Sequence, residues 1–100
     1  MENIEELGGK IFLIGFTEMD PGMKIVLKKI IGNYVRQIEE KNKDFEKITL
    51  ELEGNSPSKI KTEAIIKGDS SKIEEEDKNL FFCLDRNLSR LLEQMPKEES

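Results

Sequence analysis

The chain has 100 residues, of which 36% are hydrophobic and 37% charged, and its formal net charge is −5. This length suits one domain with a small, mostly aliphatic core, since only 6% of the residues are aromatic and none is tryptophan. The sequence has no histidine, which excludes an imidazole base or ligand, and its single cysteine excludes a disulfide framework and a thiolate zinc site. We therefore expect a cytoplasmic protein with no metal and no cofactor.

The apolar segments are too short to cross a membrane. The longest apolar run is Ile11–Phe16, whereas a spanning helix needs about 20 residues. The N-terminus, Met1–Glu6, carries three glutamates, which argues against a secretory signal. We expect no membrane partner.

The first residues predict a flexible tail followed by a strand. Residues 1–9 are polar and end in two glycines. Lys10–Phe16 is short, apolar and aromatic-rich, which is typical of a strand buried on at least one face. Asp20 before Pro21 predicts a helix start, because a carboxylate caps the first turn and proline fits the first helical position.

A long first helix is predicted from Pro21 to about Lys43. Gly32 lies in its interior, where glycine costs roughly 1 kcal/mol relative to alanine, and could mark a kink or a close contact. The apolar residues at helical spacing are Met23, Val26, Leu27, Ile30, Tyr34 and Ile38.

The middle of the chain changes to a period of two, which predicts strands. Phe45–Glu53 and Lys59–Lys67 alternate apolar and polar residues across a short turn, so we expect an antiparallel hairpin. Ser71–Glu75, around Ile73, predicts a short third strand of the same meander.

Asp77 or Asn79 can cap a second helix that runs to about Met95, before Pro96 ends it and residues 96–100 form a flexible tail. The order β-α-β-β-β-α predicts one α+β domain over residues 10–95. We expect a four-stranded mixed sheet with both helices packed on one face, since this buries every apolar stripe.

Positive charge is concentrated in the two predicted helices, whereas the acids lie in the termini and loops. Residues 21–38 contain cations and no acid, and residues 69–77 contain five acids against Lys72. At about 100° per residue, we expect the helix cations to lie opposite the apolar stripes and to share one exposed surface. These candidate RNA-binding residues are Lys24, Lys28, Lys29, Arg36, Arg86 and Arg90. The alternative is that these cations are ordinary exposed residues of the helices and bind no RNA.

The second predicted helix, from Asn79 to Met95, resembles the last helix of bacterial ribosome hibernation-promoting factors. The residue pairs that fit the family's register are Leu80-Phe81, Leu84-Asp85, Arg90-Leu91 and Gln94-Met95. Asp44–Ile48 is similar to the family's junction between first helix and second strand, and Glu75-Glu76-Asp77 to the acidic stretch before its last helix.

The resemblance implies the same β-α-β-β-β-α domain in a translation inhibitor that acts in stressed cells. Members bind the small ribosomal subunit through basic residues of the two helices. On this sequence, Arg90 lies where the family has a basic residue in the last helix, and Lys28, Lys29 and Arg36 lie on the first helix. The expected partner is therefore small-subunit ribosomal RNA, bound without catalysis.

A second hypothesis is a protein–protein module of the same fold. It would dimerise or bind a partner through the exposed sheet face or an edge strand, without RNA. No nucleophile–base pair is evident, so we expect neither an enzyme nor a small-molecule site. The acidic run Glu74–Asp77 suits a solvated or capping segment better than a metal site, and Cys83 suits a buried, inert thiol.

Overall fold

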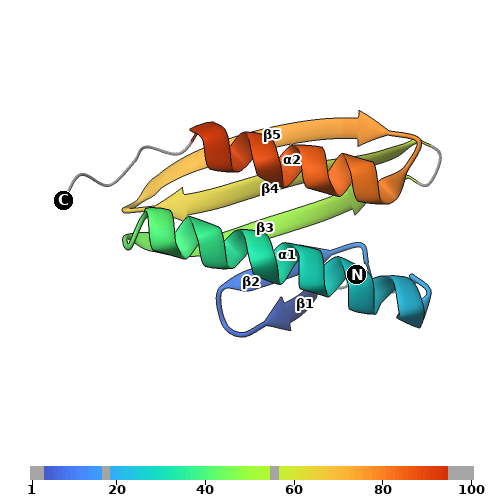
Figure 1. The fold of residues 1–100 in the computed structure, drawn as a ribbon, viewed down its shortest axis with the longest axis horizontal. Helices are drawn as coiled ribbons and strands as arrows, with labels where there is room; N and C mark the ends of the chain where they lie inside the picture. The colour runs from blue at the N-terminus through green and yellow to red at the C-terminus, as the bar shows by residue number, and fades with distance from the viewer. Residues whose placement is uncertain (1–3, 17–18, 55–56, 95–100) are drawn as a thin grey trace.

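A single mixed sheet forms the base of the fold, with the strand order β1-β2-β3-β4-β5. The computed structural model describes residues 4–16, 19–54 and 57–94. The strands are β1 (Ile4–Leu7), β2 (Ile11–Ile14), β3 (Phe45–Glu53), β4 (Ser58–Ile66) and β5 (Asp69–Asp77). Two helices, α1 (Pro21–Lys41) and α2 (Leu80–Gln94), lie side by side on one face of this sheet (Figure 1). The α+β class is confirmed.

The predicted strands pair as a βαβ unit followed by a meander. β2 and β3 are parallel because α1 returns the chain between them, and β3, β4 and β5 are antiparallel neighbours. Leu50 opposes Thr62 and Leu52 opposes Ile60, so their inward side chains meet under the helices. The β3–β4 hairpin is confirmed, and the third strand of the meander is longer than predicted.

The sheet has five strands, so the prediction of four is wrong. Where the sequence predicts a flexible tail, β1 pairs antiparallel with β2, and Leu7 lies opposite Ile11. Gly8 and Gly9 have φ values of 67° and 83° and supply the tight turn between the two strands. A strand of four residues with two glutamates gives little signal, which is why the pattern missed it. The tail predicted over 96–100 lies outside the described residues.

Side-chain caps fix both helix starts at the same end of the molecule. The Asp20 carboxylate accepts hydrogen bonds from two backbone amides of the first turn of α1, at 3.0 and 3.2 Å, which confirms the predicted start. On α2, Asn79 Oδ1 accepts bonds from the amides of Phe81 and Phe82 at 2.9 and 3.1 Å. Asp77 accepts the amide of Asn79, so Asn79 is the cap and Asp77 supports it.

The core lies between the sheet and the two helices. The buried helix positions are Leu27, Ile31, Val35 and Ile38 on α1 and Cys83, Leu84, Asn87, Leu88 and Leu91 on α2. Met23 and Val26, which the sequence places on the apolar stripe, are 38% and 48% exposed. The buried stripe of α1 therefore begins at Leu27, and the first turn of this helix extends beyond the hydrophobic core.

The first helix is unbroken over its 21 residues and includes Gly32. Apart from the adjacent backbone of α1 itself, no atom lies within 4 Å of the position that a Cβ would take on Gly32, so the close contact considered for it is absent. In the ranges that the structure describes, neither helix is apolar enough over a sufficient length to cross a bilayer.

Candidate nucleic-acid interface

The two helices form one continuous layer, here called the helix layer, that covers one face of the sheet (Figure 1). The hydroxyl of Tyr34 on α1 donates to Asp85 Oδ1 on α2 at 2.6 Å. Further along, the ammonium of Lys41 donates to the carbonyl of Leu92 at 2.5 Å. These bonds hold the two helices side by side, which is the arrangement that the predicted basic surface requires.

The Tyr34 hydroxyl donates its hydrogen bond to Asp85, a carboxylate that lies close in sequence to Arg86 and Arg90. Burial, followed by the hydrogen bond to Asp85, raises the pKa of Tyr34 to about 12. The phenol is therefore protonated at neutral pH and serves as a hydrogen-bond donor between the helices. This bond turns Asp85 toward α1 rather than toward Arg86 or Arg90.

Two of the candidate cations lie at the border of the helix layer next to β1. Lys24 Nζ is 2.9 Å from Glu5 Oε1, and Lys28 Nζ is 3.5 Å from Glu5 Oε2. The hydrogen bond from Lys24 lowers the pKa of the Glu5 carboxyl, with further help from Lys28. Because β1 supplies this partner, Lys24 and Lys28 do not lie opposite the apolar stripe as predicted.

The α2 cations lie at the other border, above β5. Arg90 Nη1 is bonded to Glu75 Oε2, and Arg86 reaches Glu75 Oε1 at 3.7 Å and Asp77 Oδ2 at 3.0 Å. The side chain of Glu75 is only 8% exposed, whereas those of Arg86 and Arg90 are about half exposed. The backbone amide of Asn79 and the Arg86 guanidinium lower the pKa of Asp77.

Only Lys29 and Arg36 remain on the outward face of α1 without an ion pair to any described residue. The six candidate cations therefore form three groups: a pair bound to β1, a pair bound to β5, and two cations between the borders that have no ion pair within the described part of the chain. The expectation of one shared positive surface is not met. The sequence pattern does not predict these ion pairs, because Glu5 and Glu75 are far in sequence from the cations that they bind.

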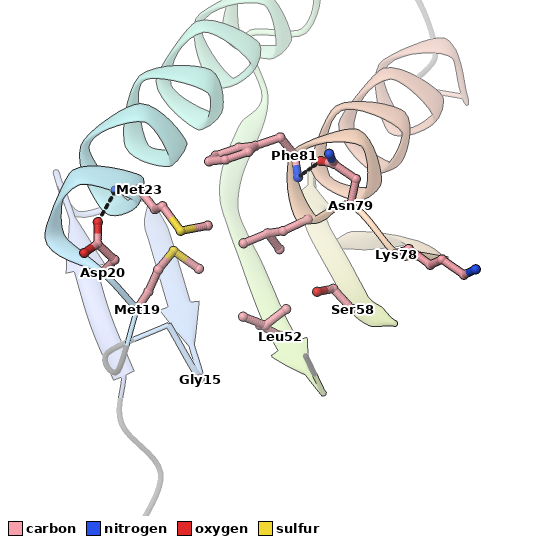
Figure 2. Close-up of a pocket in the computed structure, with 10 residues that line it drawn as sticks. Gly15, Met19, Asp20, Met23, Leu52, Ser58, Lys78, Asn79 and Phe81 are labelled. Carbon is pink, nitrogen blue, oxygen red and sulfur yellow. Dashed lines mark hydrogen bonds between the residues drawn. The ribbon is translucent and has the colours of Figure 1, made fainter. Parts of the chain in front are cut away.

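A groove opens between the N-terminal ends of the helices, and no sequence pattern predicts it. It has a volume of about 580 Å³. Figure 2 shows Met19 and Met23 on the α1 side, Phe81 on the α2 side and Leu52 beneath them. Gly15 stands at its edge, where the carboxyl ends of the parallel strands β2 and β3 meet. Polar and apolar groups contribute about equally to its lining, with Asp20, Ser58, Lys78 and Asn79 beside the apolar side chains.

The described residues contain no group of three side chains that could hold a metal ion. Cys83 is buried, and its thiol donates toward the carbonyls of Ser58 and Glu75. Burial raises the pKa of the thiol, which keeps it protonated and unreactive at neutral pH. The acidic run is part solvated and part structural, since Glu75 binds arginines and Asp77 supports the helix cap.

These features define an α+β domain with a helix layer on one face of a mixed sheet, the open face of the sheet remaining exposed. No family model and no curated protein matches the sequence. Solved structures do match: the chain is similar to the N-terminal domain of Protein Y from Thermus thermophilus, with a TM-score of 0.62. The match covers 90% of this chain and 94% of that domain at 16% identity, so the likeness is one of fold.

Proposed function

We propose that this protein is a ribosome-associated regulator that docks its helix layer on structured RNA of the small subunit and inhibits translation. The observation that carries the proposal is the fold shared with the Protein Y domain over 90% of the chain. The resemblance of the last helix to hibernation-promoting factors supports it independently. The protein would act in the cytoplasm by occupying a site, without catalysis.

Lys29 and Arg36 are the principal phosphate contacts in this proposal. Their outward position and lack of a described ion pair leave their charges available, whereas RNA must compete with Glu5 for Lys24 and Lys28. The side chains of Arg86 and Arg90 are about half exposed, so each guanidinium can contact a phosphate while it remains paired with Glu75. Few contacts make binding strongly salt-dependent, and the overall charge of −5 opposes attachment through other faces.

Co-sedimentation with small ribosomal subunits tests this proposal. We expect the protein to pellet at low salt and to be released at high salt. The double variant Lys29→Glu with Arg36→Glu should abolish pelleting, because it reverses both free cations and disturbs no described ion pair.

The matched control is Lys67→Glu with Lys72→Glu, which makes the same change of charge away from the helix layer. These side chains are 79% and 74% exposed, and their long ion pairs with Asp44 and Glu63 lie at the surface and contribute little stability. The control should therefore fold and pellet like the unmodified protein. Failure of the unmodified protein to pellet at low salt, or equal loss in both variants, would contradict the proposal.

The protein–protein module remains the second candidate, supported by exposed apolar side chains on the helix layer. Pairing through a sheet edge is opposed by charge: β1 carries Glu5 and Glu6, and β5 carries the acidic run 74–77. Either edge paired with its own copy would bring like charges together. A protein partner would therefore bind elsewhere on the surface.

A further inference from the structure

Large apolar side chains are exposed on the first turns of both helices. Phe82 on α2 is 64% exposed, and Val26 and Met23 on α1 are 48% and 38% exposed. Met23 also lines the groove, and Phe82 directly follows Leu80 and Phe81, which line the opposite wall. Exposed apolar side chains that gather at one end of a soluble protein mark interaction sites. We call Met23, Val26, Phe82 and the groove the apolar patch.

The facing walls of the groove carry apolar side chains that could contact apolar side chains of a partner. Figure 2 shows the thioethers of Met19 and Met23 directed into it and the ring of Phe81 facing them. Leu52 at the end of β3 and Leu80 complete the apolar lining. Methionine side chains are flexible and polarizable, so such a wall adapts to aliphatic and aromatic anchors. The remaining side chains of the lining are polar: Asp20 and Asn79 cap the two helices, and Ser58 and Lys78 lie beside them.

Two cations, Lys29 and Lys78, lie near the apolar patch, although the protein as a whole is acidic. Lys29 lies three residues after Val26 on α1, and Lys78 at the α2 border extends from the rim in Figure 2. Neither forms an ion pair with a described residue. The nearby carboxylates of Asp20 and Asp85 accept hydrogen bonds from the first turn of α1 and from the Tyr34 hydroxyl, and they keep their charge. Both helix N-termini add positive potential at this end.

We propose that the apolar patch binds an acidic, amphipathic segment of a partner protein. Two apolar anchors of that segment would fill the groove and cover Phe82, while its carboxylates would approach Lys29 and Lys78. The positive rim disfavours a basic partner. RNA would satisfy the cations but would leave the aliphatic side chains of Met23 and Val26 without a matching surface.

This site goes beyond the proposed ribosome function and can be tested separately from it. The probe is a short synthetic peptide of leucine, phenylalanine and glutamate, titrated into isotope-labelled protein and followed by NMR. Its counterpart has lysine for every glutamate. We expect only the acidic peptide to bind, with shifts in the amides of the first turns of α1 and α2.

Phe82→Ser and Val26→Ser should each weaken binding of the acidic peptide about tenfold, as truncation of an interface anchor does. Lys78→Glu should also weaken it, although this lysine is not among the RNA contacts proposed above. The matched control is Ile4→Ser, which removes a side chain 56% exposed on the far face of the sheet and should leave binding unchanged.

Three results would overturn this proposal. The first is equal binding of both peptides, or of neither. The second is a dimer in sedimentation experiments that Phe82→Ser converts to a monomer, because a second copy would then occupy the patch. The third is binding of an RNA hairpin that requires Phe82 while the acidic peptide does not bind.

Discussion

Glu75 forms ion pairs with two arginines of α2, whereas the sequence predicts that it belongs to a solvated or capping run. It faces inward on β5 with 8% of its side chain exposed, and Arg86 and Arg90 neutralise it from α2. Nearly buried carboxylates require such partners, because desolvation without a counter-charge is costly. The two arginines therefore hold α2 to the sheet, whatever else they bind.

Arg90→Glu should lower the free energy of unfolding by about 1–3 kcal/mol, because it places a second carboxylate against Glu75. Urea denaturation measures the change. Arg36→Glu makes the same change of charge on the outward face of α1 and should stay within about 0.5 kcal/mol of the unmodified protein. Equal stability of the two variants would show that the Glu75 pair contributes nothing.

Tyr34 is the only tyrosine of the chain, so its ionisation can be followed by ultraviolet absorbance. We expect ionisation at about pH 12 in the folded protein, against an ordinary pKa of 10.0. Between these values the unfolded chain loses the proton and the folded protein keeps it, so stability falls as pH rises through this window. Asp85→Asn should move the pKa only part of the way back, because burial is the larger cause. Ionisation near pH 10 in the folded protein would contradict the interhelical bond.

At the scale of elements, two glycines should respond oppositely to alanine. Gly32 lies within α1, and no atom outside the adjacent helix backbone lies within 4 Å of its Cβ position, so Gly32→Ala should stabilise the protein by about 0.5–1 kcal/mol. Thermal or urea unfolding measures this gain. A loss of stability would mean that α1 needs the glycine for a bend.

Gly15→Ala should instead destabilise the protein by at least about 2 kcal/mol. Gly15 has a φ of 84°, and an added Cβ would lie 2.6 Å from the Leu52 carbonyl oxygen. The clash is with backbone, so no side-chain movement relieves it. Stability unchanged by this substitution would contradict the close approach of β2 and β3 at the edge of the groove.

Periodicity predicted the elements that carry a long, regular pattern. The alternation in 45–53 and 59–67 and the helical spacing of the last helix needed no tertiary information. The strand β1 could not be found in this way. Its four residues include two glutamates, and they form a strand only because they pair with the edge of β2 and because Glu5 forms ion pairs with Lys24 and Lys28. The alternation of Ile73, Glu75 and Asp77 was the available signal for the full length of β5.

The candidate interface was only half predictable for the same reason. Helical spacing correctly placed Lys29 and Arg36 on the outward face, since they depend on α1 alone. Lys24, Lys28, Arg86 and Arg90 depend on strands distant in sequence, and their ion pairs appear only in the folded molecule. The exposure of Met23 follows from where the core ends, which no local pattern reports. Phe82 is exposed because it lies opposite the buried positions of α2, as helical spacing indicates.

At the scale of the whole molecule, charge is divided between the faces. The open face of the sheet is crossed by ion pairs such as Lys61–Glu53 and Lys72–Glu63, which satisfy its charges internally. The helix layer keeps free cations and the apolar patch. We therefore expect the helix layer to be the face that meets the ribosome and any protein partner.

Photo-crosslinking from defined positions tests this orientation most directly. A photo-reactive amino acid at Asn33, between Lys29 and Arg36 on the exposed side of α1, should crosslink to small-subunit ribosomal RNA. The same group at Glu63, on the open face of the sheet, should give no RNA crosslink. Crosslinks from Glu63 and none from Asn33, or no crosslink from either position, would contradict docking through the helix layer.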